Sequence, residues 1–247
     1  MRDLGYLTRQ PVAHRGLHDA GRGIVENTGT AILAAAQRGY GIEIDVQPSA
    51  DGEAMVFHDD TLDRLTLGSG ETRAFSAAQL KRIPFRNTPD TILTLGEALA
   101  LVEGRVPLLI ELKSRFSGDV RLAARVVAVL GTYRGPIGVM SFDPEMIAEV
   151  RRLDPARVRG IVSARHFGEN EWRNLAPGTR RDLRHLLHWP RTRFQFLAYR
   201  VADIAALPPR VLRALGMPVF AWTVRTVAER EMASAYADQM IFEGFQP

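Results

Sequence analysis

The sequence predicts an α/β protein built as a (β/α)8 barrel. Short runs of apolar and β-branched residues alternate along the chain with longer stretches rich in Ala, Leu and Arg, as in repeated βα units. Its 247 residues suit one such barrel or two small domains, and no linker or low-complexity tract divides the chain. Polar side chains stand at the ends of several apolar runs, where barrel strands meet a common mouth. We therefore expect one domain over residues 1–247.

Nine segments have the length and composition of strands, whereas a barrel needs eight. Between residues 46 and 54 there is no room for the helix that a parallel connection requires, so segment 54–58 is expected to form an antiparallel hairpin beside the barrel. A turn around Asp51-Gly52 would place Asp45 opposite His58. The alternative counts this strand in the barrel and leaves the last one outside. The nine segments are 11–14, 41–46, 54–58, 107–112, 137–142, 158–163, 194–199, 219–224 and 240–243.

Helices are expected between most of these segments, and three of them have recognisable ends. Residues 60–92 contain turn residues and little periodicity, which predicts a small insertion that forms a flap above the barrel mouth. The helix signals are a start near Glu26-Asn27-Thr28 with an end by Gly39, a capping box of Thr94 and Glu97 with an end near Gly104, and the N-cap and first helical residue Asp143-Pro144.

Composition excludes several classes of protein. The absence of cysteine excludes disulfides, thiolate nucleophiles and cysteine-ligated zinc. No apolar run approaches the ~20 residues that span a bilayer, and the first ten residues contain no apolar stretch of signal-peptide length. We therefore predict a cytoplasmic protein without a transmembrane segment. The net charge is +4, but the arginines are not gathered in one stripe with aromatic residues, which disfavours a nucleic-acid partner.

Two carboxylates are predicted to face the barrel mouth. Glu43 and Asp45 are two residues apart on a strand and share one face, whereas the flanking aliphatic residues face the helices. Acids this close repel each other, and one of them retains a proton unless a cation joins them. Glu111, which follows another apolar run, completes an oxygen cluster suited to one Mg²⁺ or Ca²⁺ ion. The alternative is a salt bridge of these acids with Arg15 or Lys113.

Histidine titrates near neutral pH, and two histidines stand at strand ends beside charged residues. His14 and His58 are therefore candidates to share the general base and general acid roles in cleavage of a phosphate ester. Arg15 offers a planar fork for phosphate oxygens, and Lys113, two residues after Glu111 on the same face, offers a compact point charge. The remaining histidines are expected to be surface or structural residues, namely His18, His166, His185 and His188.

These residues together resemble the glycerophosphodiester phosphodiesterase family, which is related to phosphatidylinositol-specific phospholipase C. The resemblance covers nearly the whole chain, with the motifs in order. The matching motifs are Ala13-His14-Arg15-Gly16, Glu26-Asn27-Thr28, Glu43-Ile44-Asp45-Val46, residues 51–59, Asp63-Arg64, Glu111-Leu112-Lys113, Ser141-Phe142 and Trp222.

The resemblance implies a TIM barrel with a small insertion after the second-histidine motif and a divalent metal at the mouth. It also implies roles for side chains already singled out. The acid–base pair is then His14 and His58, the metal ligands are Glu43, Asp45 and Glu111, and the phosphate contacts are Arg15 and Lys113.

Two further residues have two possible roles each. Trp222 lies near the end of a predicted strand and is either part of the core or packs against the glycerol part of a substrate. Asn27 is either a helix cap or a ligand to substrate or metal, and the two uses are compatible. The chain also departs from the family pattern: Val25 replaces the usual proline, Phe242-Glu243 replaces the usual Thr-Asp, and the insertion is short.

We predict a phosphoric diester hydrolase that cleaves a small-molecule glycerophosphodiester into sn-glycerol 3-phosphate and an alcohol. One divalent cation would lower the pKa of the attacking oxygen, which belongs either to water or to the glycerol 2-hydroxyl. A first alternative is a lyase-type phospholipase that stops at a cyclic phosphate. A second alternative, from another class, is a non-catalytic, arginine-rich protein that binds polyanions.

Overall fold

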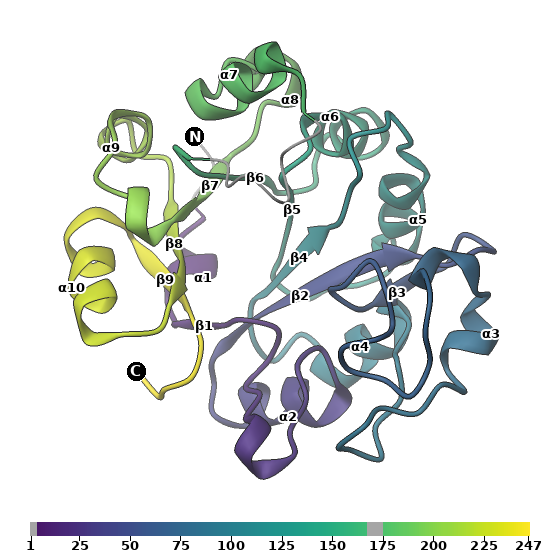
Figure 1. Ribbon diagram of the computed structural model, residues 1–247. Helices are drawn as coiled ribbons and strands as arrows, with labels where there is room; N and C mark the ends of the chain where they lie inside the picture. The colour runs from purple at the N-terminus through teal and green to yellow at the C-terminus, as the bar shows by residue number, and fades with distance from the viewer. Residues whose placement is uncertain (1–3, 167–174) are drawn as a thin grey trace.

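The computed structural model describes residues 4–166 and 175–247, and its strands close into a barrel (Figure 1). In the nine-stranded sheet β1 pairs with both β2 and β9, so the sheet closes on itself. β3 joins through β2 as an antiparallel strand, which leaves eight parallel strands in the barrel and confirms the predicted fold. The strands are β1 (Val12–Ala13), β2 (Gly41–Pro48), β3 (Ala54–Val56), β4 (Leu108–Leu112), β5 (Ile137–Ser141), β6 (Arg159–Ser163), β7 (Phe196–Arg200), β8 (Val219–Val224) and β9 (Gln239–Phe242).

The hairpin of β2 and β3 lies beside the barrel as predicted, but its register differs by one residue. The backbone carbonyl of Asp45 accepts a hydrogen bond from the amide of Phe57, so Phe57 rather than His58 lies opposite Asp45. The reason is the turn. A three-residue loop, 50–52, with Gly52 at a φ of 81°, connects the strands, whereas the expected pairing requires a two-residue turn. The prediction that Asp45 faces His58 across the hairpin is therefore wrong.

Helices surround the barrel (Figure 1), and the predicted helix signals are confirmed. Thr94 and Glu97 form a capping box, and the Asp143 side chain accepts a hydrogen bond from the amide of Glu145. The helices are α1 (Gly5–Thr8), α2 (Gly29–Gln37), α3 (Ala77–Leu80), α4 (Leu95–Val102), α5 (Arg121–Leu130), α6 (Pro144–Leu153), α7 (Pro177–His185), α8 (Trp189–Thr192), α9 (Leu207–Ala214) and α10 (Val227–Tyr236), with 3-10 turns η1 (Ala20–Arg22), η2 (Thr72–Ala74) and η3 (Val201–Asp203).

Two apolar layers line the two sides of the barrel wall. Side-chain alternation along β2 places Ile42, Ile44 and Val46 against the helices, as predicted. On the inner side Phe196 and Phe220, whose ring centroids lie 5.6 Å apart, help to fill the bore. Two leucines of the N-terminal segment pack against this inner cluster. This packing fills the bore with apolar side chains.

The inserted segment 60–92 lies beside β3 and α4 (Figure 1) and packs around a small core of its own. Two isolated bridges, Thr61 with Glu71 and Thr66 with Phe85, tie its turns together. This core supports the stretch that follows β3 and ends near the barrel mouth. Its buried members are Met55, Phe57, Leu62, Leu80, Phe85 and Ile92.

The residues that follow β9 run between α10 and α2 (Figure 1). Phe245 packs there against Phe242, with ring centroids 5.6 Å apart. Within residues 4–166 and 175–247, no helix has both the length and the apolar character needed to cross a bilayer.

Candidate active site

Three carboxylates meet at the carboxyl-terminal end of the barrel strands. Asp45 of β2 and Glu111 of β4 are paired in the parallel ladder, and Glu43 lies two residues before Asp45 on the same face. One oxygen from each carboxylate lies within 4.8 Å of the others. Glu43, Asp45 and Glu111 are only 1%, 1% and 8% exposed. The structure therefore brings together the three acids that the sequence singles out as metal ligands.

The surroundings shift the pKa values of two acids of this cluster in opposite directions. Burial raises the pKa of Glu43 well above its usual value, and the charges of Asp45 and Glu111 raise it further. Burial would also raise the pKa of Asp45, but neighbouring cations, Lys113 first among them, outweigh burial and hold that pKa far below its usual value. The surroundings therefore favour the neutral form of Glu43 and the ionised form of Asp45.

Lys113 lies between two of the acids. Its ammonium nitrogen is 2.9 Å from Asp45 Oδ1 and 2.7 Å from Glu111 Oε1. Burial would lower the pKa of Lys113, but the two carboxylates raise it, so the ammonium is charged. The salt bridge that the sequence leaves as an alternative to metal ligation is thus present, and it coexists with the clustering that metal ligation requires.

The donor set fits a divalent hard cation. All three acids offer carboxylate oxygens, which Mg²⁺ and Ca²⁺ prefer. Glu43 Oε1 is buried and has no hydrogen-bond partner among the described residues. A cation bound to this oxygen would satisfy it and favour the ionised form of Glu43. Glu26, His58 and Asp59 also lie within 4.8 Å of one another, but arginine side chains already engage both of those carboxylates.

His14 follows β1 and is held by a residue from the far end of the chain. Its Nδ1 lies 2.7 Å from Glu243 Oε2, and its Nε2 lies 3.9 Å from Glu43 Oε2. Because an ionised carboxylate only accepts hydrogen bonds, Nδ1 of His14 carries the proton. Burial lowers the pKa of His14, although the hydrogen bond with Glu243 opposes this effect. His14 is therefore neutral at pH 7, with Nε2 free to accept a proton.

His58 follows β3 and is held by the next residue in the chain. Its Nδ1 lies 2.7 Å from Asp59 Oδ1, so this nitrogen also donates. The side-chain amide of Gln47 donates to the backbone carbonyls of both His58, at 2.8 Å, and Asp59. Both catalytic candidates, His14 and His58, are close enough to Asp45 to lower its pKa. The two imidazoles therefore lie around the same acid cluster.

Arg15 lies at the mouth with its guanidinium engaged by acids. Its Nη1 donates to Glu26 at 2.6 Å, and its Nε lies 3.3 Å from Asp45 Oδ2. Its backbone amide also donates to Glu43 Oε2 at 3.0 Å. The left-handed backbone of Arg15 and of Gly16, with φ values of 56° and 80°, turns the chain tightly enough to aim both the amide and the guanidinium at the acids.

Asn27 supports Asp45 instead of capping a helix. Its amide nitrogen donates to Asp45 Oδ2 at 2.9 Å, and its amide oxygen accepts from the backbone nitrogen of Asp45 at 3.1 Å. The cap of α2 is Thr28, whose hydroxyl accepts from the amide of Ala31. The helix-cap interpretation of Asn27 is therefore wrong, because the residue after it occupies that position.

Trp222 of β8 points to the inner side of the barrel and is half-buried. Its ring meets that of Phe142 edge to face, with centroids 5.4 Å apart. Its indole nitrogen is buried and has no hydrogen-bond partner among the described residues. Trp222 therefore packs against the core, and its indole N–H remains without a hydrogen-bond partner among the described residues.

Sequence reasoning missed the two carboxylates that hold the histidines. Asp59 directly follows His58 in a matched motif, which was a usable signal. Glu243 is noted in the sequence only as a departure from the family pattern, yet it accepts hydrogen bonds from both His14 and Arg225. Its position after the last strand was the available signal, because β9 lies beside β1 in the closed barrel.

The other histidines lie outside the acid cluster. His166 is exposed and pairs with Asp203, and His185 is exposed. His188 is buried against Phe194, and burial lowers its pKa to about 4. These positions agree with surface or structural roles.

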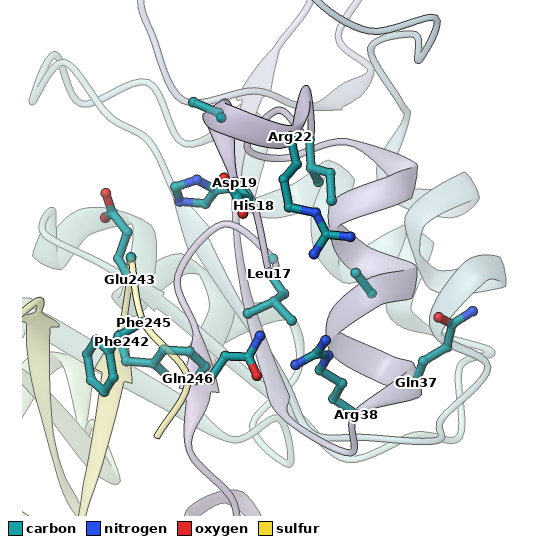
Figure 2. Close-up of a pocket in the computed structure, with 16 residues that line it drawn as sticks. Leu17, His18, Asp19, Arg22, Gln37, Arg38, Phe242, Glu243, Phe245 and Gln246 are labelled. Atoms are coloured by element: carbon teal, nitrogen blue, oxygen red, sulfur yellow. The ribbon is translucent and has the colours of Figure 1, made fainter.

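A cleft of about 630 Å³ lies outside the barrel, between the β1–α2 loop and the residues after β9. His18 and Glu243 line this cleft together with Arg22 and Arg38 (Figure 2). Its lining includes Glu243, the hydrogen-bond partner of His14. It includes neither candidate catalytic histidine and none of the three clustered acids. We therefore place the chemistry at the barrel mouth.

Comparison with known proteins agrees with this geometry. A family model described as the glycerophosphoryl diester phosphodiesterase family matches residues 14–244. The chain is 32% identical over 166 residues to a putative glycerophosphodiester phosphodiesterase, YhdW, of Bacillus subtilis, which covers 64% of this chain and 67% of that protein. It is 28% identical to glycerophosphodiester phosphodiesterase 1 of Bos taurus over an alignment of 270 residues, which covers 96% of this chain and 79% of that protein.

Solved structures extend the agreement to the fold. A phosphodiesterase of Oleispira antarctica in complex with the product sn-glycerol-3-phosphate superposes with a TM-score of 0.77 and 25% identity, over 94% of this chain and 92% of that one. A putative glycerophosphoryl diester phosphodiesterase of Silicibacter pomeroyi has a TM-score of 0.76 and 22% identity, over 94% and 89% of the two chains. The second likeness supports the barrel fold alone.

Proposed function

Because the chain belongs to the glycerophosphoryl diester phosphodiesterase family and is a phosphoric diester hydrolase, we propose a specific reaction for it. The proposed substrate is a glycerophosphodiester, and the products are sn-glycerol 3-phosphate and an alcohol. One divalent cation and the pair His14 and His58 would carry the reaction. The product named for the Oleispira antarctica phosphodiesterase supports this choice of substrate.

The observation that carries the proposal is the arrangement of two imidazoles around three acids. Nδ1 of His14 and Nδ1 of His58 each donate to a carboxylate, at 2.7 Å in both cases. This hydrogen bond fixes the tautomer, so that Nε2 of each ring is the nitrogen available for proton transfer. Two such nitrogens beside an acid cluster match the needs of phosphodiester cleavage, which removes one proton and supplies another.

Glu43, Asp45 and Glu111 would hold the cation, and either Mg²⁺ or Ca²⁺ meets this set of oxygen donors. When bound, such an ion neutralises phosphate charge and lowers the pKa of the attacking water or hydroxyl group. Asn27 would keep Asp45 oriented toward the ion through its two hydrogen bonds.

Arg15 and Lys113 would stabilise charge on the phosphoryl oxygens. Both side chains pair with the acids when no substrate is bound, and both remain charged. Trp222 would pack against the glycerol carbons from the inner side of the barrel, with its indole nitrogen available to a hydroxyl. These contacts would orient the phosphate between the two imidazoles.

We assign to His14 the removal of the proton from the attacking oxygen. Its lowered pKa keeps the ring neutral at pH 7, with Nε2 unprotonated. His58 would then protonate the leaving alkoxide. If a cyclic phosphate forms from the glycerol 2-hydroxyl, the same two groups exchange roles when water opens the ring.

The test is turnover of glycerophosphocholine, glycerophosphoethanolamine and glycerophosphoglycerol, followed by ³¹P NMR. We expect release of sn-glycerol 3-phosphate that stops with EDTA and returns with Mg²⁺ or Ca²⁺. A cyclic phosphate that persists as the final product would instead support the lyase. No turnover of any diester, together with salt-sensitive binding to polyanions, would support the polyanion-binding alternative.

We also propose a cytoplasmic location and a place in lipid and glycerol metabolism, since the substrate class derives from glycerophospholipids. Fractionation of cells that express the tagged protein tests the location.

A further inference from the structure

Arg64 joins two carboxylates that stand behind the proposed catalytic groups. Its Nε and Nη2 donate to the two carboxylate oxygens of Asp59, at 2.6 and 2.9 Å. Its Nη1 and Nη2 donate to the two oxygens of Glu26, at 2.9 and 2.7 Å. Both pairings are bidentate, the arrangement in which a guanidinium orients a carboxylate most strictly. A single side chain thus fixes Asp59 and Glu26 relative to each other.

Each of these carboxylates holds a group that acts on the substrate in the proposed reaction. Asp59 accepts the hydrogen bond of His58 at 2.7 Å, and Glu26 accepts that of Arg15 at 2.6 Å. Arg15 also reaches Asp45 in the acid cluster. A continuous row of alternating charges therefore runs from the acid cluster to the second histidine, through Arg15, Glu26, Arg64 and Asp59.

We propose that Arg64 is a positioning residue of the phosphodiesterase reaction, which holds His58 and the phosphate-binding Arg15 at the separation that the reaction needs. This inference rests on the proposed function, because the roles of His58 and Arg15 come from it. Lysine does not replace arginine here, since an ammonium group lacks the planar fork that grips two carboxylates at once.

The backbone of Arg64 is anchored in the insertion and not in the barrel. Leu62 and Thr66, on either side of it, are fully buried, and the Thr66 amide donates to the Leu62 carbonyl at 3.1 Å. Glu26, in contrast, belongs to the β1–α2 loop of the barrel. Arg64 therefore couples the packing of the insertion to the geometry of the mouth. This coupling gives the insertion a role in positioning the proposed catalytic groups.

Removal of Arg64 would displace both His58 and Arg15, for an electrostatic reason. Oxygens of Glu26 and Asp59 lie within 4.8 Å of each other. Burial would raise the pKa of each carboxyl, but hydrogen bonds with Arg64 and Arg15 for Glu26, and with His58 and Arg64 for Asp59, keep both pKa values below the usual range. Without the guanidinium between them, two negative charges face each other and move apart. His58 and Arg15 would then lose their alignment, which lowers the rate of the bound complex more than its affinity.

The experiment compares Arg64→Ala with Arg82→Ala in the full-length, metal-loaded enzyme. Arg82 is an exposed arginine of the same insertion, and its side chain forms no ion pair within residues 4–166 and 175–247. We expect Arg64→Ala to lower kcat on glycerophosphocholine by about 10–100-fold, with a smaller change in KM, in line with the loss of supporting hydrogen bonds at other active sites. Arg82→Ala is expected to keep the kcat of the wild type.

Two further measurements separate positioning from a general loss of structure. Methylguanidine at millimolar concentration is expected to restore part of the kcat of Arg64→Ala, and to leave that of His58→Ala unchanged. The double variant Arg64→Ala/Asp59→Asn is expected to lose less activity than the product of the two single losses, because both residues act on His58 and only Arg64 also acts on Arg15. Arg64→Lys, which keeps the charge and the fold, is expected to remain below the wild type.

The outcomes distinguish this inference from the proposed function. If the wild type releases no sn-glycerol 3-phosphate, the proposed function fails, and if His58→Ala keeps full activity, the proposed role of His58 fails. If both of those controls behave as proposed but Arg64→Ala and Arg64→Lys match Arg82→Ala, only the role of Arg64 is overturned. Additive losses in the double variant would equally overturn it.

Discussion

The two histidine arms of the mouth have the same chemistry and opposite origins. In each arm Nδ1 donates to a carboxylate at 2.7 Å, and an arginine holds that carboxylate from the other side. The carboxylate of His14 comes from Glu243, 229 residues away, whereas that of His58 is the adjacent Asp59. The first arm therefore exists only when β9 returns to β1 and closes the barrel. The second arm depends on one hairpin and the insertion.

The arms also differ in their exposure to water. The His14 side chain is 12% exposed and the His58 side chain 25%. A more buried imidazole is held more strictly by its surroundings, and burial favours its neutral form. Barrel closure therefore fixes the position of His14, while the hairpin and the insertion fix that of His58.

The largest expected effect comes from removal of either imidazole. His14→Ala and His58→Ala should each lower kcat by about 10²–10⁴-fold, the usual contribution of a general acid or base. His185→Ala, which changes an exposed histidine outside the mouth, is the control. Steady-state kinetics with circular dichroism measures the losses. Full activity in a folded variant of one arm would remove that histidine from the mechanism.

The next largest effect is a difference in stability between alanine variants of two glycines. One glycine follows His14, and the other lies in the hairpin that leads to His58. Gly16 and Gly52 have φ values of 80° and 81°, but an added Cβ at Gly16 would lie 2.8 Å from the backbone of Ala31, whereas the space at Gly52 is open. Gly16→Ala should reduce the free energy of unfolding by about 3 kcal/mol, from strain plus overlap. Gly52→Ala should reduce it by about 1 kcal/mol, from backbone strain alone. Urea unfolding of both variants decides this, and equal losses would contradict it.

Removal of the orienting carboxylates should have a smaller effect on activity than removal of the imidazoles. Glu243→Gln and Asp59→Asn should each lower kcat by about 10–100-fold, because the ring keeps its place but loses its fixed tautomer. We expect the larger loss in Glu243→Gln, since the more buried arm has less access to water as a substitute. A larger loss in Asp59→Asn would reverse the assignment of strictness to the two arms.

The smallest predicted effect is on stability in acid. The hydrogen bond with His14 lowers the pKa of Glu243 to about 2, below its usual value of 4.5. A carboxyl whose folded pKa is depressed stabilises the protein above its unfolded pKa, and this contribution is lost as the pH falls from about 4.5 toward 2. After allowance for solvent screening, the loss should be about 1–2 kcal/mol. Urea unfolding at pH 5 and pH 3 should show this decrease in the wild type, and a smaller decrease in Glu243→Gln.

Much of the fold was predictable because its signals are local. The strand runs, the capping box at Thr94 and the N-cap at Asp143 depend on residues close together in the chain, and all are present. The exclusion of β3 from the barrel followed from the short connection alone. The hairpin register was not predictable from residue types, since a turn containing Gly52 fits loops of two or three residues.

The candidate site divides in the same way. Side-chain alternation along one strand put Glu43 and Asp45 on one face, so their pairing was readable from the sequence. The role of Asn27 as a support for Asp45, and the bridge made by Arg64, needed coordinates, because each contact joins separate segments of the fold.

The sequence by itself determined which chemical groups the protein carries and, through periodicity and caps, on which faces of which elements they stand. Barrel closure and the packing of the insertion decided which of those groups touch. Glu243 reaches His14, and Arg64 ties Glu26 to Asp59, across distances along the chain that no local pattern encodes. The physical reason is that hydrogen bonds between charged groups depend on positions within a few ångströms, and only tertiary packing sets those positions.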